Sequence, residues 1–283
     1  MSQTVAIIGA GGKMGQRAAT KLHGNPQYRL FLCETNAERA AVLEEEGLEL
    51  TPQTAALGEA DLVILSVPDA LIGAIAHELV PQMKPGAVLI MLDAAAAYVG
   101  DLSLREGLTY MITHPCHPGL FIDQATPEQR QDYFGGLAVQ DIIVSLVQGQ
   151  ESKFSLGVEL CKAVFSPVRK VHRVTPEQFA ILEPAMSEVV VASAACLMKE
   201  ALEMAIKAGV PREAAEAFMW GHTRIALAIA FGVEASPFSD GAKIAIEWGS
   251  KRVLKPNWRE VFQPDQISEA VQMMLHPNPV KRS

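Results

Sequence analysis

The sequence lacks the features of several large protein classes. Its cysteines are scattered, without a Cys-x-x-Cys pair, which argues against a disulfide-rich secreted scaffold and indicates reduced thiols; they are Cys33, Cys116, Cys161 and Cys196. It has no excess of positive charge, since 24 Lys and Arg face 32 Asp and Glu. The formal net charge of -8 gives no broad attraction to nucleic acid or to anionic lipid.

Long apolar runs are also missing. No segment is long and apolar enough to span a bilayer, and the N-terminus shows neither a basic leader segment nor a cleavage site. The expected location is therefore the cytoplasm. What is present is the composition of a globular protein, with 49% hydrophobic and 20% charged residues among 283, enough for two domains. A small-molecule ligand is the expected partner.

Short apolar runs alternate with helix-length amphipathic segments through the first half, the pattern of βαβ units with a parallel sheet. The predicted strands are 4–8, 30–33, 62–66, 88–92 and 110–113. Two later runs, 142–147 and 168–172, flank a predicted helix at 153–164 and can extend the same sheet. The fold class is therefore α/β, a Rossmann doubly wound sheet with extra strands.

The second part of the chain changes to helix. Thr175 followed by Pro176 predicts an N-cap, and one long helix rich in Ala, Met, Leu and Glu is expected to run to about residue 208 and to end at Gly209. A second helix is expected from Pro211 to about Phe231. The predicted domains are 1–174, which binds the dinucleotide, and 175–283, an all-α domain for substrate binding and dimerisation.

A glycine-rich turn follows the first predicted strand directly. Glycines at this position allow a tight turn and let a pyrophosphate lie against N–H groups at a helix N-terminus. A plain strand-to-helix turn is the alternative interpretation. The predicted cofactor-binding residues of the turn are Gly9, Ala10, Gly11, Gly12, Lys13, Met14 and Gly15.

Two further segments belong to the predicted cofactor site. Glu34 stands at the end of the second strand, where an acid accepts hydrogen bonds from ribose hydroxyls and repels a 2′-phosphate, which favours NAD. Arg39 keeps NADP open, because an arginine near this strand end can bind a phosphate. The next strand end lines the same crevice with Val67, Pro68 and Asp69.

A pair of histidines lies at the same predicted edge of the sheet. His114 and His117 stand in the segment Thr-His-Pro-Cys-His-Pro, whose prolines stiffen the backbone as a catalytic group requires. Either imidazole can act as a general base or as a metal ligand. The alternatives are that the histidines only bond backbone in a proline-rich turn and that Cys116 is packed rather than a thiolate ligand.

With these motifs the chain resembles the family of 6-phosphogluconate and 3-hydroxyisobutyrate dehydrogenases, with prephenate dehydrogenase as a more distant relation. In that family a catalytic lysine lies near the start of the long helix, and the corresponding position here, counted from His172, is Glu183. The histidine segment, Glu183 and the run Met-Trp-Gly-His that ends at His222 resemble a smaller group more closely. Its members are NAD-binding proteins with a phosphogluconate-dehydrogenase-like C-terminal domain, D-apionate oxidoisomerase among them.

This resemblance implies oxidation of an alcohol of a branched or linear sugar acid by NAD, coupled to a metal-assisted shift of the carboxylate group. It implies His114 and Glu183 as ligands of a divalent metal, zinc or magnesium, with His117 or His222 as a further ligand or base. His114, His117 and Glu183 are thus the expected catalytic residues. Glu183 at a helix start can also simply favour the helix dipole, and His222 can be a core histidine.

Apolar faces on both long helices exceed what a small helical domain needs to bury, which predicts a homodimer. The segment from Ser239 to Lys243 is expected either to contact a substrate or to cap a helix. Two other functions are weighed against the leading hypothesis. One is a metal-free dehydrogenase of a 3-hydroxy acid or a prephenate-like substrate, with His114 as base. The other is a regulatory protein that senses NAD without turning it over.

Overall fold

The computed structural model describes residues 2–276, which form two compact units. The first unit comprises the described residues up to Ile181 together with those from Ser268 onward, and the second runs from Leu182 to Ile267. The functional division into domains 1–174 and 175–283 stays a prediction. No helix in residues 2–276 is long and apolar enough to cross a membrane.

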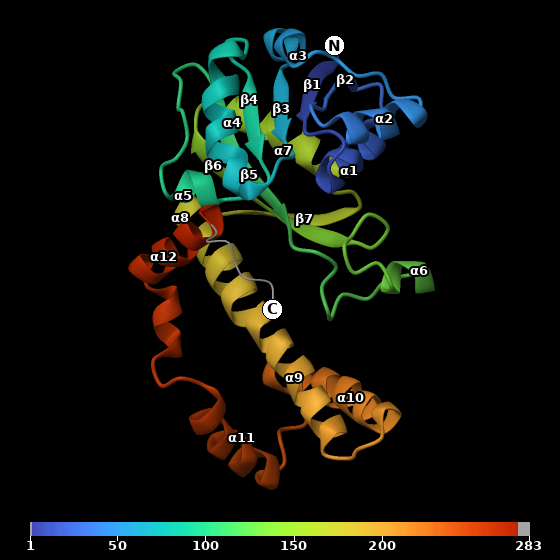
Figure 1. The fold of residues 1–283 in the computed structure, drawn as a ribbon, viewed down its shortest axis with the longest axis vertical. Coiled ribbons are helices and arrows are strands. Elements are labelled where there is room, and N and C mark those ends of the chain that lie inside the picture. The colour runs from blue at the N-terminus through green and yellow to red at the C-terminus, as the bar shows by residue number, and fades with distance from the viewer. Residues whose placement is uncertain (1, 277–283) are drawn as a thin grey trace. The chain divides into compact units, whose positions relative to one another are not determined.

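A seven-stranded sheet forms the centre of the first unit, in the order β2-β1-β3-β4-β5-β6-β7 (Figure 1). The strands are β1 (Gln3–Ile8), β2 (Tyr28–Cys33), β3 (Leu62–Leu65), β4 (Val88–Met91), β5 (Thr109–Pro115), β6 (Gln140–Gln148) and β7 (Val168–Arg173). Strands β1 to β5 are parallel, β6 runs antiparallel to β5, and β7 runs parallel to β6. The predicted Rossmann sheet and its two added strands are confirmed.

Helices cover both faces of this sheet. On one face α1 (Lys13–Leu22) and α7 (Glu151–Val164) bury Leu22 and Leu160 against alternate strand residues such as Ile7. On the other face α3 (Gln53–Glu59) and α4 (Ile72–Leu79) bury Leu57 and Leu79. The other helices before residue 181 are α2 (Ala37–Glu45), α5 (Ala95–Tyr98), α6 (Pro127–Arg130) and α8 (Pro176–Ala180), with 3₁₀ turns η1 (Asp69–Leu71) and η2 (Val80–Gln82).

The predicted helix start at Thr175 is confirmed. The Thr175 hydroxyl accepts a hydrogen bond from the Gln178 backbone N–H at 3.2 Å, and the Gln178 side chain accepts one from the Thr175 N–H at 3.0 Å. The prediction of one continuous α-helix after this start is wrong for its middle part. There the π-helix η3 (Ile181–Ala192) separates α8 from α9 (Ser193–Lys207). Pro184 lies inside η3, and a proline there lacks the N–H that an α-helix needs and crowds the preceding turn.

The second unit is helical, as expected. After η3 and α9, it contains α10 (Arg212–Ala230), which packs against α9, then α11 (Asp240–Val253), η4 (Trp258–Phe262) and the first residues of α12 (Pro264–Leu275). Ser239 caps α11, because its hydroxyl accepts a hydrogen bond from the Ala242 N–H at 3.2 Å, and Lys243 pairs with Asp240 at 3.0 Å. These contacts agree with the capping interpretation of this segment.

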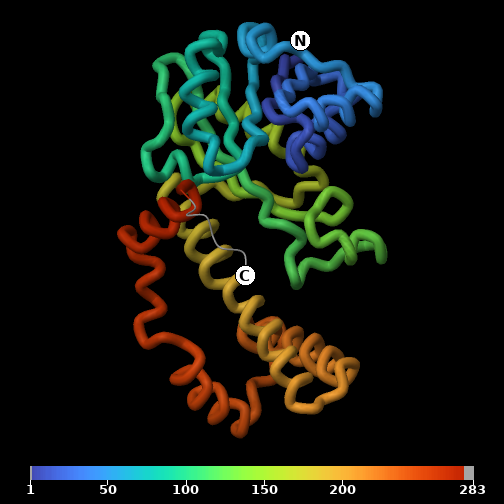
Figure 2. The backbone as a smooth tube through the Cα atoms, in the orientation of Figure 1, coloured from blue at the N-terminus to red at the C-terminus, as the bar shows by residue number. Residues whose placement is uncertain are grey.

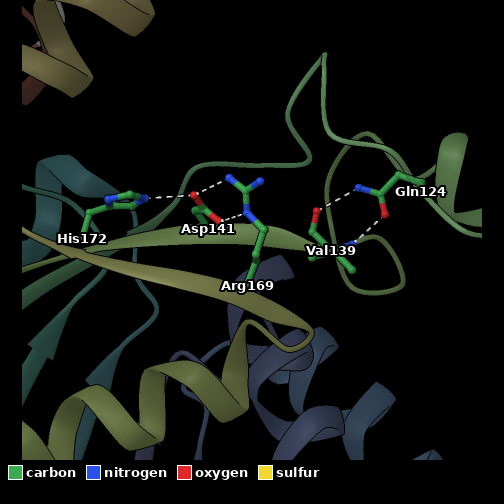
Figure 3. Close-up of polar contacts among 5 residues, drawn as sticks. All are labelled: Gln124, Val139, Asp141, Arg169 and His172. Atoms are coloured by element: carbon green, nitrogen blue, oxygen red, sulfur yellow. Dashed lines mark hydrogen bonds and ion pairs between the residues drawn. The ribbon is translucent and has the colours of Figure 1, made fainter.

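Polar side chains join the two added strands (Figure 3). The Asp141 carboxylate on β6 accepts two hydrogen bonds from Arg169 on β7, both 2.9 Å, and lies 2.9 Å from His172 Nε2. In the connection before β6, the Gln124 side-chain amide exchanges two 2.9 Å hydrogen bonds with the backbone of Val139. The hydrogen bond from Arg169, helped by His172, lowers the pKa of Asp141 from 3.8 to about 2.

This shift makes the stability of the fold depend on pH. A carboxylate whose pKa is lower in the folded chain stabilises it above the unfolded pKa near 4, and this contribution is lost as the pH falls toward about 2. We expect Asp141→Asn to unfold at lower urea concentration than wild type at pH 6, with the difference shrinking as the pH falls from 4 toward 2. Asp123→Asn, which changes an exposed carboxylate of the preceding connection, serves as control. A difference that stays constant with pH would contradict this role of Asp141.

Candidate functional site

The glycine-rich turn lies between β1 and α1, with Gly12 as the N-cap of α1. Gly9 has φ +77°, a conformation that favours glycine, and its carbonyl accepts a hydrogen bond from the Gly12 N–H at 3.0 Å. At Gly15, a Cβ atom would lie 2.2 Å from the Gly9 carbonyl oxygen, so α1 packs directly on the turn. The N-terminus of this ten-residue helix thus lies at the carboxyl edge of the sheet, where an anion is favoured.

Glu34 lies next to this turn, directly after β2. One carboxylate oxygen accepts a hydrogen bond from the Gly11 N–H at 2.9 Å, and the other accepts from Thr35 and Asn36, both at 2.9 Å. These bonds fix the acid where a ribose bound at the turn would present its hydroxyls. Arg39 lies over the same turn, since a Cβ on Gly11 would come 2.6 Å from the Arg39 Cβ.

The loop after β3 meets the same turn. A Cβ on Gly9 would lie 2.5 Å from the Ser66 carbonyl oxygen and 3.2 Å from a Val67 methyl group. Pro68 and Asp69 follow at the start of η1. The structure therefore brings the glycine turn, Glu34 and Val67 together, while their binding of a cofactor stays a prediction.

His114 lies inside β5 rather than in a loop, because the strand continues to Pro115. The expected end of this strand at residue 113 is wrong, since pairing with β6 extends it, and His114 lies opposite Ile143. Its Nδ1 lies 2.8 Å from the Pro115 carbonyl oxygen, and because a carbonyl only accepts, Nδ1 donates and Nε2 carries the lone pair. Burial lowers the pKa of His114 from 6.5 to about 4, so the ring is neutral at pH 7.

His117 completes a histidine pair. Its ring centroid lies 5.8 Å from that of His114, at an interplanar angle of 81°. Among the described residues it is the one non-glycine with a positive φ, 58°, a strained conformation of the kind found at functional sites. Between the histidines, burial and the charge of Asp141 raise the pKa of Cys116 to about 11, so it is a thiol at neutral pH.

The remaining predicted residues belong to the second unit. Glu183 lies partly buried on η3. His222 is exposed on α10, where its Nδ1 donates to the Phe218 carbonyl at 3.0 Å and its ring stacks on Phe218 at 3.7 Å. In residues 2–276 no three His, Cys, Asp or Glu side chains gather in a way that could hold a metal ion. The pairing of His114 with Glu183 on a metal therefore stays a prediction.

Two models of known protein families match the chain, one over its N-terminal part and one over its C-terminal part. Residues 1–164 match the NADPH-binding domain of acetohydroxy acid isomeroreductase, and residues 122–275 match the C-terminal domain of decarboxylating phosphogluconate dehydrogenase. D-apionate oxidoisomerase of Cupriavidus necator is 42% identical over 96% of this chain and 99% of that protein. The enzyme of the same name from Rhizobium rhizogenes is 41% identical over 95% and 98%. The chain belongs to the D-apionate oxidoisomerase family.

Solved structures agree with membership of this oxidoreductase family. A crystal structure of a semialdehyde dehydrogenase NAD-binding protein from Cupriavidus necator, in complex with calcium and NAD, is 41% identical, has a TM-score of 0.93 and covers 97% of this chain and 100% of that one. A ketol-acid reductoisomerase from an uncultured archaeon, 19% identical with a TM-score of 0.67, shares the fold, and the two chains match over 97% and 82% of their lengths. The resemblance found in the sequence is thus confirmed.

One residue beside the histidines was missed in the sequence. Phe134 contacts both His117 and Lys13, whose ammonium lies 3.5 Å from the centre of its ring. It stands in the connection between β5 and β6, and no local pattern links it to the histidine segment. The two glycines that follow it mark a turn but do not say what the turn approaches.

The close contact at Gly15 generates a prediction for cofactor binding. We expect Gly15→Ala to weaken NAD binding by about tenfold or more, because the added methyl group must push α1 off the turn. Isothermal titration with NAD measures this, and far-UV circular dichroism checks the fold. The matched control is Gly58→Ala in α3, where a Cβ meets no atom within 4 Å. Unchanged affinity in Gly15→Ala would place the dinucleotide elsewhere.

Proposed function

We propose that this chain is an NAD-dependent oxidoisomerase of D-apionate, which oxidises an alcohol of this branched sugar acid and shifts its carboxylate group. The near full-length similarity to relatives of that name carries the proposal. Glu34, held at the glycine turn by the Gly11 N–H, supports NAD over NADP, because its charge repels a 2′-phosphate. The similar protein crystallised with NAD adds support for the same cofactor.

The histidine pair supplies the acid–base chemistry of the proposal. Oxidation of an alcohol removes its C–H hydrogen as a hydride and its O–H hydrogen as a proton. NAD, when bound, accepts the hydride. His117 lies beside His114 and can accept the proton, because Nε2 of neutral His114 is the nitrogen proposed for the metal; His114 would be the base only in a metal-free reaction. In the shift that follows, the C–C bond to the carboxylate breaks at an alcohol carbon and forms at the neighbouring carbonyl carbon. The alcohol carbon becomes the new carbonyl as its O–H proton leaves to a base, and the former carbonyl oxygen takes the negative charge and is then protonated.

A divalent metal is the second part of the proposal, with His114 and Glu183 as its ligands. The donor set fits by its chemistry, because a neutral imidazole and a carboxylate are both ordinary ligands of divalent metals. The relative crystallised with calcium supports a divalent cation, although mixed nitrogen and oxygen ligands favour zinc over magnesium. A bound cation would stabilise the charged oxygen formed in the shift. For the remaining role of base or further ligand, His117 is preferred to His222, whose ring is engaged on its own helix.

The direct test is turnover of D-apionate by the purified full chain. We expect absorbance at 340 nm to rise with NAD and D-apionate, little activity with NADP, and a product whose carbon skeleton, read by ¹³C NMR, differs from that of D-apionate. EDTA should abolish the activity and added zinc or magnesium should restore it. A panel of linear sugar acids provides the specificity control.

Each alternative predicts another result. Formation of NADH with an unrearranged product, unaffected by EDTA and without metal in the purified protein, would indicate a metal-free dehydrogenase of a 3-hydroxy or prephenate-like acid. Tight NAD binding without NADH formation from any acid of the panel would indicate an NAD-sensing regulatory protein. Either result would contradict the proposed oxidoisomerase.

We also infer that the enzyme is a cytoplasmic homodimer formed through its helical part. Helix α11 buries none of its residues, and its large apolar side chains Ile244 and Trp248 are 70% and 60% exposed. On α10, Phe218 is 67% exposed. Such surfaces are typical of interfaces between subunits.

Light scattering coupled to size-exclusion chromatography tests the dimer. We expect a mass near twice the 30.5 kDa of one chain. Trp248→Glu should move the mass toward that of the single chain, because a charge would replace an apolar contact, whereas Tyr133→Glu outside the helical part should not. A wild-type mass of one chain would contradict the inference.

A further inference from the structure

The connection between β5 and β6 leaves the sheet and returns to it (Figure 2), and its turn around Phe134 packs on α1. The Phe134 ring lies under the Lys13 ammonium, 3.5 Å from the ring centre, and near the Arg17 guanidinium at 5.5 Å. One turn further along the helix, the Lys21 ammonium donates to the Gly136 carbonyl at 2.8 Å. Residues spaced by four on one face of α1 therefore bind this turn.

The Asp132 side chain holds the turn together through hydrogen bonds to its backbone. Its carboxylate accepts hydrogen bonds from the backbone N–H groups of Gly135, Leu137 and Ala138, at 2.9, 2.7 and 2.9 Å. Burial opposes ionisation, but these bonds and the charge of Arg17 lower the pKa of Asp132 below its usual value. Specific hydrogen bonds therefore fix the backbone of segment 132–138, which we name the Asp132 turn.

The Asp132 turn also contacts the histidine pair. The Phe134 carbonyl lies 2.9 Å from His117 Nδ1, and the two rings lie 5.4 Å apart. Since a carbonyl oxygen only accepts, His117 must donate from Nδ1, and in its neutral form the lone pair is on Nε2. Arg17 donates to the same carbonyl at 3.4 Å, which helps to hold the oxygen in place.

We propose that Phe134 is a positioning residue of the active site: anchored on Lys13 and Arg17 of α1, it fixes the tautomer and orientation of the imidazole of His117. The ring supplies the anchor, and the carbonyl selects the tautomer. This inference rests on the proposed function in one respect, that His117 takes part in the reaction. A carbonyl partner of this kind commonly sets which histidine nitrogen faces a substrate or metal.

Nitrogen-15 NMR of histidine-labelled full-length protein, without substrate, tests the positioning directly. We expect the ring nitrogens of His117, assigned by their loss in His117→Gln, to report a protonated Nδ1 and an unprotonated Nε2 at pH 8. Phe134→Leu removes the anchor and should convert this pattern to a mixture of tautomers. Phe134→Tyr, which keeps a ring, should restore the wild-type pattern. Tyr133→Leu is the matched control, because Tyr133 is 81% exposed.

Turnover of D-apionate provides the second readout. We expect Phe134→Leu to lower kcat by about tenfold or more while the KM for NAD changes by less than about twofold, as for loss of an oriented base. Asp132→Asn, which loosens the turn without touching Phe134, should act in the same direction, and Asp123→Asn in the same connection should not. Circular dichroism verifies that each variant is folded.

The outcomes separate the two proposals. A wild-type tautomer pattern in folded Phe134→Leu and Asp132→Asn overturns the positioning role, as does wild-type kcat in His117→Gln. If the wild-type chain does not turn over D-apionate but the tautomer changes as expected, the proposed substrate fails while the role of Phe134 is supported.

Discussion

Contact between the first turn of α1 and the end of β1 governs the rest of this structure. Gly15 lies so close to the Gly9 carbonyl oxygen that any side chain at that position would separate the helix from the sheet. This closeness places the N-terminus of α1 directly beyond the carboxyl edge of the parallel strands. Because β2 and β3 end at the same edge, Glu34 and Val67 meet the turn as well, so one backbone contact organises the whole predicted dinucleotide site.

Reversal of the strand direction between β5 and β6 adds the second half of the site. The connection must leave the edge of the sheet and come back along it, which carries Phe134 to α1 and to His117. At the return, Asp141 binds Arg169 and His172, which joins the two added strands. The position of the family's catalytic lysine was counted along the chain from His172. In the structure this histidine has a structural partner, Asp141. Through Phe134, the histidine pair is thus connected to α1, the helix of the predicted cofactor site.

The sequence predicted those features whose cause is local. The glycine spacing, the acid at the end of β2 and the cap at Thr175 each act within a few residues of themselves, and the structure has each where it was expected. The strand end at His114 was misplaced because pairing with β6, about 30 residues later, extends β5. The π-helix around Pro184 was missed because the prediction followed the helix-forming composition of the run and did not weigh this proline. Phe134 could not be found, since only the folded connection brings it to residues far away in the chain.

The central claim is the proposal that this chain is an NAD-dependent oxidoisomerase in which a divalent metal, with His114 and Glu183 as its proposed ligands, assists the carboxylate shift. A crystal structure of the protein with NAD, a divalent metal and D-apionate tests it most directly. The account predicts that His114 Nε2 and a Glu183 carboxylate oxygen both lie within about 2.0–2.6 Å of one metal ion beside the nicotinamide C4. A metal held by other residues, or His114 and Glu183 directed to separate places, would contradict it.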